Sequence, residues 1–369
     1  MYKRVVSAAA VGAMALGVAA CGSSSGSGSS KGASGGGGSN KSASMPKVSM
    51  MVGGIDKQIY LPYELAQRLG FYKKYGVDMT LSTEANGGVG AEDAMVSGSV
   101  DMAGAWYIHT IDFQSKGKDV TDIAQLSGAP GEREMCATGS GVHSAADFKG
   151  KNLGVTDLGS GTDELTQFLA SQHNITKKQY STIVVHDGAT AIAALQGKSA
   201  NCVMTTQPTV GAIESKKVGY SAIDLATTKG ATAALGGAWP AASVLVTQKW
   251  VDDNKVAAQG VVDALVATMH WINTHSATDI ANMLPPDYVQ NASISKAQYI
   301  AGLTTDKGQF LPDGIMPAGG PKTVYAMAKT IGTDVSKVKV ADTFTNTFVM
   351  AALKKEGLKA TSTPAGPNG

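Results

Sequence analysis

Cysteine, charge of one sign and long apolar runs are all scarce in this sequence of 369 residues. It contains only three cysteines, and its 31 basic and 29 acidic residues leave a formal net charge of +2. Beyond the N-terminus no apolar stretch reaches the roughly eighteen residues of a membrane-spanning helix. No basic run persists there either. The shortage of cysteine excludes a disulfide-dense scaffold, and the mixed charge disfavours nucleic acid as a partner.

Metal-binding motifs are also missing from the sequence. The six histidines are scattered, and the closest pair, His270 and His275, lacks the i, i+4 spacing that places two ligands on one helical face. Two cysteines, Cys136 and Cys202, lie in segments with strand character, so they either form a disulfide or remain buried thiols. We therefore expect no metal and no cofactor.

The first 21 residues have the pattern of an export signal. Lys3 and Arg4 precede an apolar run over residues 5–20, and small residues close that run. The ending Val-Ala-Ala-Cys resembles the lipobox of bacterial lipoproteins, in which Cys21 becomes the acylated first residue of the mature chain. We expect residues 1–21 to be a signal peptide and Cys21 to be a lipid anchor. An ordinary signal peptide or a signal anchor, with an incidental cysteine, is the alternative.

Both flanks of the folded region have compositions that cannot form a core. Residues 22–45 are almost entirely Gly, Ser, Ala, Lys and Asn, which predicts a flexible tether that reaches roughly 25–30 Å. Residues 359–369, rich in Pro, Gly, Ser and Thr, are expected to form a disordered tail. Signal, lipidated cysteine and tether together predict a domain that works outside the cytoplasm while it is anchored to the cell membrane.

Between these flanks, strand-like and helix-like segments alternate. This alternation predicts an α/β fold in which parallel sheets are covered by helices on both faces. The pattern occurs twice, and a long helix over 254–275 follows the second occurrence. The predicted strands are 47–52, 77–82, 102–106, 134–138, 152–156, 182–186, 201–205 and 242–247.

One α/β unit is predicted to be inserted within the other. Lobe 1 would comprise residues 46–130 and 237–358, and lobe 2 residues 131–236. The chain would then cross between the lobes twice, which makes a two-strand hinge and a cleft. Because open α/β sheets bind ligands beyond the carboxyl ends of their strands, loops of both lobes would face each other across that cleft.

Several stretches resemble the extracytoplasmic solute-binding proteins of ABC importers, of the nitrate/sulfonate/taurine type that also includes pyrimidine-precursor binders. The resemblance implies a two-lobed periplasmic-binding-protein fold of the type II kind, a small-molecule ligand and an ABC permease as partner. We expect a monomer, and the dispersed histidines and the cysteines within predicted strands lead us to expect no enzymatic activity. The stretches are 61–77 (LPYELAQRLGFYKKYGV), 94–105 (AMVSGSVDMAGA), 146–155 (ADFKGKNLGV), 189–208 (ATAIAALQGKSANCVMTTQP) and 344–346 (FTN).

Candidate ligand-binding residues follow the predicted strands. In lobe 1 a double glycine allows backbone N–H groups to approach a ligand, and aromatic rings at a strand end suit a planar one. A tight turn and core packing are the structural alternatives. The candidates in this lobe are Gly54, Ile55, Asp56, Gln58, Trp106 and Tyr107.

The candidates in lobe 2 and at the crossings also have both a ligand-binding and a purely structural interpretation. Free N–H groups at a helix start can hold a polar group, although the start can equally be an ordinary N-cap. The planar fork of Arg133 suits a carboxylate or sulfonate, whereas an ion pair with Glu132 or Glu134 is the alternative. The full set is Arg133, Ser160, Gly161, Thr162, Thr206, Gln207 and Trp239, the last of which either covers the ligand or packs the hinge.

A solute-binding protein is the function that this pattern favours. The expected solute is sulfonate- or taurine-like, or a small aromatic or heteroaromatic compound, and one with a planar part is preferred over a bare anion. Two alternatives remain open: an enzyme related to pyrimidine-precursor synthesis, and a lipid-anchored sensor or adhesion domain. No arrangement of catalytic residues can be placed at one site from the sequence.

Overall fold

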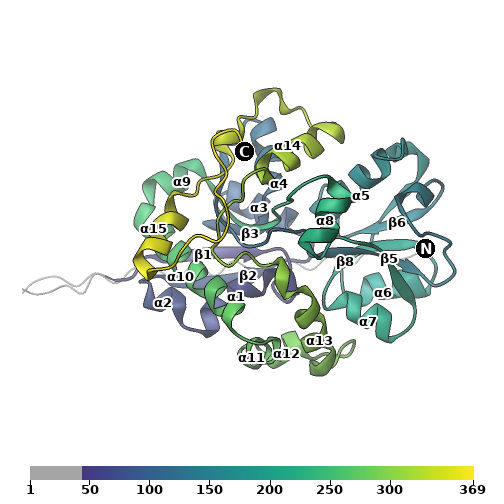
Figure 1. Cartoon of the computed structure of the whole chain (residues 1–369), viewed down its shortest axis with the longest axis horizontal. Coiled ribbons are helices and arrows are strands. Elements are labelled where there is room, and N and C mark those ends of the chain that lie inside the picture. Colours follow the sequence, from purple (N-terminus) through teal and green to yellow (C-terminus); the bar gives the residue numbers. More distant parts are fainter. Residues whose placement is uncertain (1–43) are drawn as a thin grey trace, which may run out of the picture. The chain divides into compact units, whose positions relative to one another are not determined.

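The structure is a computed structural model that describes residues 44–369. These residues form two five-stranded sheets (Figure 1). The predicted signal peptide, the lipidated Cys21 and nearly all of the predicted tether lie outside the described residues. Each sheet has helices on both faces, as the sequence predicts.

The first sheet has the strand order β2-β1-β3-β10-β4. Strands β1 (Lys47–Val52), β2 (Asp78–Thr83) and β3 (Met102–Trp106) are parallel, whereas β10 (Ala242–Thr247) is antiparallel to both β3 and β4 (Val120–Gln125). The prediction of purely parallel sheets is therefore wrong. The reason is that β10 enters this sheet from the second one and so runs against its neighbours.

The second sheet repeats the same mixed pattern, with the order β7-β6-β8-β5-β9. Strands β6 (Asn152–Val155), β7 (Ser181–Val184) and β8 (Cys202–Thr206) are parallel. Strand β5 (Glu132–Ala137) is antiparallel to β8 and to β9 (Gly219–Asp224). The chain passes from the first sheet to the second between β4 and β5, and it returns between β9 and β10. We call the two resulting layers lobe 1 and lobe 2; the residue boundaries predicted for them remain predictions.

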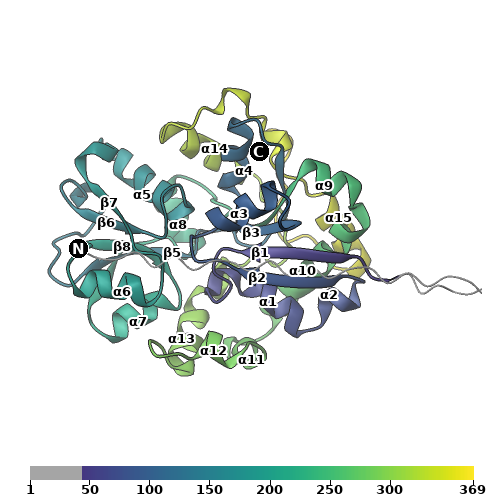
Figure 2. The ribbon, with the colours of Figure 1, turned by 180° about the vertical axis from the view of Figure 1, so that it is seen from behind.

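Helices cover the first sheet on both faces (Figures 1 and 2). On one face lie α3 (Val89–Val96) and α4 (Ile108–Ser115), with α14 (Gly320–Thr330) packed on α4. The other face carries α1, α2, α10 and α15. Their bounds are Leu61–Arg68, Phe71–Lys74, Lys255–Thr274 and Thr347–Glu356, and α9 (Gln248–Asp253) follows β10.

Lobe 2 is covered in the same way. Helix α5 (Gly161–Ser171) packs on β6 and β8 and α8 (Thr228–Leu235) on β9, while α6 (Ala189–Gln196) and α7 (Thr209–Ser215) cover the opposite face. Three further helices form a group that bridges the lobes, since its first helix packs on α1 of lobe 1 and its third on α7 of lobe 2 (Figure 1). They are α11 (Ala277–Met283), α12 (Pro286–Val289) and α13 (Lys296–Asp306).

A glycine in β3 allows α1 to lie close to the first sheet. A side chain at Gly104 would come 2.9 Å from the ring of Tyr63, which is fully buried. The Tyr63 hydroxyl donates a hydrogen bond to the carbonyl of Ser243 at 2.6 Å. A buried tyrosine thus joins α1 to β10 and satisfies its own polar atom, as buried hydroxyl groups require.

The two cysteines of the folded region lie opposite each other on β5 and β8. Cys136 and Cys202 are joined by a disulfide bond, so of the two alternatives the structure has the bridge. The bond ties together strands that are 66 residues apart in the sequence. Among residues 44–369, no helix combines the length and the hydropathy that a membrane crossing requires.

The C-terminal residues differ from the disordered tail that the composition predicts. Asp313 is 1% exposed, and its carboxylate accepts hydrogen bonds from the backbone N–H groups of Thr361 at 2.7 Å and Ser362 at 2.6 Å. The hydroxyl groups of both residues donate to it as well. A buried carboxylate needs such donors, and here the tail supplies them.

Candidate functional site

A cavity of about 790 Å³ lies between the two lobes. Loops that follow strands of both sheets line it, which is where open α/β sheets bind ligands. Lobe 1 contributes residues after β1 and β2, and lobe 2 contributes residues after β7 and β8, together with the segment 291–294 between α12 and α13. The lining comprises Gly54, Asp56, Lys57, Thr83, Glu84, Ala85, His186, Asp187, Gly188, Ala189, Thr190, Ile192, Pro208, Thr209, Ala212, Asn291, Ala292, Ser293 and Ile294.

An ion pair crosses this cavity from one lobe to the other. The ammonium of Lys57 lies 3.6 Å from Asp187, and both side chains are largely buried. The other oxygen of Asp187 accepts hydrogen bonds from the hydroxyl groups of Thr205 at 2.7 Å and Thr209 at 2.6 Å, and from the N–H of Gly188 at 2.8 Å. Asp187 is therefore held in one position by four partners, and its charge is balanced.

Asp56 is the carboxylate of the cavity that lacks such compensation. It lines the cavity, and its partial removal from solvent raises its pKa, with the negative charge of Asp187 as the second cause. By contrast, Glu84 accepts hydrogen bonds from the backbone N–H groups of Asn86 and Gly88. The cavity thus presents one carboxylate that is free to meet a hydrogen-bond donor or a cation.

The rest of the lining near lobe 2 is mainly apolar. Ile192 of α6, Ala212 of α7 and Ile294 of the segment before α13 contribute aliphatic side chains, and Pro208 adds its ring. A ligand would meet this apolar surface on one side and the polar loop of Asp56 on the other. That combination is typical of sites for small organic molecules.

The predicted residues Gln58 and Gln207 are not part of the cavity lining, and they join the lobes. The backbone N–H of Gln58 donates to the carbonyl of Gln207 at 3.0 Å, and the Gln58 amide donates to the carbonyl of Tyr299 in α13 at 2.9 Å. The Gln207 side chain accepts from the N–H of Gly211. Both glutamines therefore hold lobe 2 and α13 against the loop after β1.

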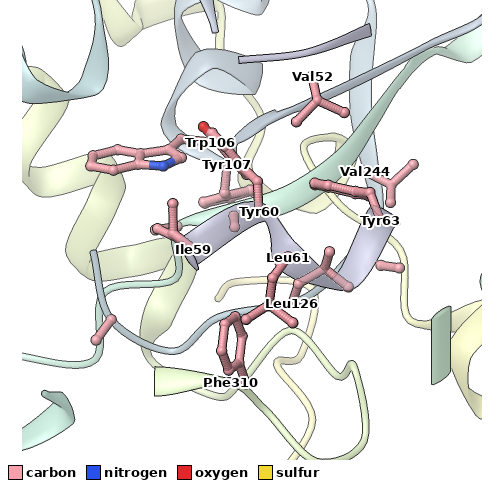
Figure 3. Close-up of a cluster of buried hydrophobic side chains, with 14 of the residues drawn as sticks. Val52, Ile59, Tyr60, Leu61, Tyr63, Trp106, Tyr107, Leu126, Val244 and Phe310 are labelled. Atoms are coloured by element: carbon pink, nitrogen blue, oxygen red, sulfur yellow. The ribbon is translucent and has the colours of Figure 1, made fainter. Parts of the chain in front are cut away.

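The predicted aromatic residues pack against each other and not against the cavity. Trp106 is 4% exposed and belongs to the same buried apolar cluster as Ile59 and Tyr60 (Figure 3). Its ring meets that of Trp239 edge to face, with centroids 5.3 Å apart. A Cβ added at Gly161 would overlap the Trp106 ring. The absence of a side chain at Gly161 thus lets the start of α5 in lobe 2 rest on a tryptophan of lobe 1.

The remaining aromatic candidate, Tyr107, points into lobe 1. It is fully buried, and its hydroxyl group hydrogen-bonds the Thr343 hydroxyl at 2.5 Å. The backbone of Tyr107 is helical (φ −53°, ψ −36°), because this residue begins the turn into α4, so it is not part of the extended segment that the sequence predicts. Ile55 is likewise buried, although its neighbours Gly54 and Asp56 line the cavity.

The start of α5 is an N-cap. The Ser160 hydroxyl accepts from the N–H of Asp163, and it also hydrogen-bonds the hydroxyl groups of Thr156 at 2.9 Å and Thr162 at 2.8 Å. The three hydroxyl groups form a closed network in which each is buried. In this arrangement the predicted polar residues Ser160 and Thr162 bind each other.

Arg133 and Thr206 are also engaged within the protein. The Arg133 guanidinium makes two hydrogen bonds to Asp306 of α13, each 2.7 Å long, and lies 3.5 Å from Asp224. Its partners are therefore not Glu132 or Glu134, the neighbours that the sequence suggested. Thr206 donates to the carbonyl of Gly131 at 2.6 Å. Both contacts join lobe 2 to neighbouring segments.

Sequence reasoning missed most of the cavity lining. Lys57 lies between two predicted residues, and Asp187 directly follows the predicted strand over 182–186, so the strand-end rule could have identified both. The segment 291–294 carried no such signal, because it connects two helices and reaches the cavity only through the packing of α13 against α7.

Comparisons with known proteins agree on the fold. A Bordetella bronchiseptica protein of solved structure is 30% identical, with a TM-score of 0.79 over 84% of this chain and 98% of that one. The periplasmic nitrate-binding protein NrtA from Synechocystis PCC 6803 is 16% identical, with a TM-score of 0.69 over 88% of this chain and 92% of its own. The described residues thus have the two-lobed periplasmic-binding-protein fold that the sequence predicts.

Sequence relatives include enzymes as well. The 4-amino-5-hydroxymethyl-2-methylpyrimidine phosphate synthase THI12 of Saccharomyces cerevisiae is 32% identical over 129 residues. That match covers 34% of this chain and 37% of the yeast protein, so the chain spans little more than a third of the relative's length. Residues 59–275, more than half of the chain, match the family described as NMT1/THI5 like. The chain therefore belongs to the NMT1/THI5-like family.

Proposed function

We propose that the protein is the solute-binding component of an ABC importer, anchored outside the cytoplasm by a lipid at Cys21, and that it is not an enzyme. One observation carries the proposal: the cavity lies between two lobes, and strand-end loops of both contribute to it. The two lobes would separate to admit a solute, close on it and present it to a permease. Contacts made only in the closed form would then give the affinity.

The charges of the cavity narrow the class of solute. Three carboxylates line it, those of Asp56, Glu84 and Asp187, against the ammonium of Lys57, which already pairs with Asp187. A sulfonate or nitrate would meet no unpaired cation among the residues of this lining. We therefore favour a small organic solute with an amine, amidine or other strong hydrogen-bond donor directed at Asp56 and an apolar part against Ile192.

Thermal unfolding with a panel of solutes tests this proposal. The panel contains amines, amidines, aminopyrimidines, sulfonates, carboxylates and nitrate. A ligand at about a hundred times its dissociation constant stabilises the folded state by roughly 2.7 kcal/mol, which raises the melting midpoint by several degrees. A shift with a cationic or donor-rich solute that is recovered unchanged supports the proposal. A shift confined to sulfonates or nitrate contradicts the solute class, and no shift with any compound contradicts the binding function.

A single substitution then tests whether the solute contacts Asp56. Asp56→Asn removes the charge but keeps the size, and the loss of a charge-assisted hydrogen bond of about 1.5–3 kcal/mol should weaken binding roughly tenfold to a hundredfold. Asp78→Asn is the matched control, because Asp78 is an exposed carboxylate of β2 outside the cavity lining. Equal affinities of the two variants would remove Asp56 from the site.

An enzyme is the second candidate, and the similarity to pyrimidine phosphate synthases within the shared segment is what supports it. The two candidates differ in the fate of the ligand. Chromatography of each stabilising compound after prolonged incubation would return it intact from a binding protein. Consumption of a compound, with a new product formed, would favour the enzyme.

A further inference from the structure

Three helices bring a histidine and three carboxylates together where the lobes meet. His109 and Asp112 lie on α4, Glu92 lies on α3, and Glu164 lies on α5 of lobe 2. The His109 Nδ1 atom is 3.3 Å from Asp112, and its Nε2 atom is 3.6 Å from Glu92. One potential ligand atom from each of His109, Asp112 and Glu164 lies within 4.8 Å of the others. None of the four residues lines the cavity.

Several polar atoms of this cluster lack partners despite their burial. His109 Nε2, Glu92 Oε1 and Glu164 Oε2 have no hydrogen-bond partner anywhere in residues 44–369. His109 and Glu92 are each 3% exposed, and Glu164 is 6% exposed. Unpaired polar groups at such depth are costly unless a proton or a cation compensates them.

The residue types in this cluster, and their positions around the imidazole of His109, suit a metal ion. Imidazole nitrogen and carboxylate oxygen are ligands that first-row divalent ions such as Zn²⁺ accept, and two carboxylates balance the charge of one such ion. A histidine that ligates a metal usually donates its other ring N–H to a carboxylate. Glu92 has the position for that role, because it faces Nε2 while Asp112 faces Nδ1.

We propose that this cluster is a binding site for a divalent transition-metal ion such as Zn²⁺, with His109, Asp112 and Glu164 as ligands and Glu92 as the residue that orients the imidazole. An ion about 2.0–2.2 Å from each ligand atom requires those atoms to lie within roughly 4 Å of one another, so small side-chain rotations complete the site. Because α4 belongs to lobe 1 and α5 to lobe 2, the ion joins the lobes in their closed arrangement. The site reverses the expectation from the sequence, in which the histidines were too dispersed to predict a metal.

Titration calorimetry of the full-length chain, first stripped with a chelator, tests the site with Zn²⁺ as the probe. We expect one ion per chain, together with a rise in the melting midpoint. Glu164→Gln and Asp112→Asn, which keep the side-chain size, should each weaken binding at least tenfold, as should His109→Gln. His173→Gln is the control for ions held by exposed histidines, and Glu134→Gln is the control for a buried carboxylate outside the cluster.

The outcomes separate a metal site from a cluster that holds protons. Stoichiometric Zn²⁺ binding that the cluster variants weaken and the two controls retain supports the site. Absence of binding, or binding that survives Glu164→Gln and Asp112→Asn, overturns it. Circular dichroism of each metal-free variant shows whether it is folded, and should His109→Gln fail to fold, the two carboxylate variants decide the result. None of these measurements depends on the solute or on the proposed transport function.

Discussion

Asp187 and Glu164 are both carboxylates of lobe 2 that face lobe 1, yet their surroundings differ. Asp187 accepts three hydrogen bonds from its own lobe and pairs with Lys57 of the other. Glu164 has an oxygen without a partner and the Asp112 carboxylate as its neighbour. At the cavity, the Asp187–Lys57 contact between the lobes is therefore a balanced ion pair, whereas the α4/α5 contact needs a proton or a cation to compensate Glu164. Other contacts in the protein also differ in whether their buried groups are compensated, and substitutions can test what that difference does to stability.

The largest effect is expected at the apolar contact between the lobes. Trp106→Ala removes a buried ring that packs on Trp239 and on the start of α5, and such truncations cost about 3–5 kcal/mol. Urea unfolding measures the loss. Trp250→Ala is a milder control, because Trp250 is only partly buried on α9. A loss below about 1 kcal/mol for Trp106→Ala would show that the ring does not hold the lobes together.

Removal of one partner of a buried, balanced ion pair should lower the free energy of unfolding. Arg133→Ala leaves Asp306, which is 1% exposed, without its bidentate partner, and breaking a buried pair in this way costs about 3 kcal/mol or more. Arg68→Ala removes the pair with Glu64 on α1, where the arginine side chain is 49% exposed, and should cost less than about 1 kcal/mol. Similar losses for the two variants in urea would contradict the difference in burial.

A methyl group added between the lobes should separate them without removing any existing side chain. Gly161→Ala places a methyl group against the Trp106 ring, and overpacking of this kind costs about 1–3 kcal/mol. We expect the radius of gyration from small-angle scattering to increase because the lobes move apart. Gly308→Ala meets no atom within 4 Å and should leave both stability and radius unchanged. An unchanged radius in Gly161→Ala would show that the ring, not the lobe, moves.

The last prediction concerns how stability depends on pH, and it rests on an unbalanced carboxylate away from the boundary. Burial, with the charge of Glu132 as the second cause, raises the pKa of Glu134 to about 8, and neither of its oxygens has a partner in the described chain. Between its unfolded pKa of about 4.3 and this folded pKa, the folded state binds one more proton than the unfolded state, so stability falls as the pH rises.

Urea unfolding at several pH values from about 5 to 8 measures this effect. Glu134→Gln should flatten the decline and be more stable than the parent at the alkaline end, because the amide keeps the shape without the charge. Cys136 and Cys202 stay bridged in both proteins, so no thiol titrates beside the site. A pH dependence that the substitution leaves unchanged would mean that Glu134 is ionised or compensated in the folded state.

Local sequence signals predicted the strands that carry apolar residues. Strands β1, β3 and β10 have the predicted bounds, whereas β4 and β9 were missed. β4 reads VTDIAQ and is buried throughout, but its polar side chains hid the strand pattern. Their burial is possible only because of partners distant in the sequence: the Gln125 amide donates to the carbonyl of Ala242 at 2.9 Å. No local signal contains that information.

The candidate site was predictable to the same extent. Gly54 and Asp56, which their position after a strand predicts as ligand-binding residues, both line the cavity. Position after a strand could not predict that α5 would cover the ring of Trp106. That contact depends on Gly161, whose missing side chain lets α5 approach the ring. Nor could position after a strand reveal the His109 cluster, because the residues are spread over 73 positions and three helices meet only in the folded protein.

The attachment of the C-terminal residues to Asp313 also determines how the protein would respond to force. Strand β1 is part of the first sheet, and residues 361–365 bond to Asp313 and Met316 near α14. The chain enters and leaves lobe 2 in the middle of its sequence, between β4 and β5 and between β9 and β10. A pull applied between residues 44 and 369 would thus load lobe 1 along its own strands, and lobe 2 would bear no tension until the first sheet had given way.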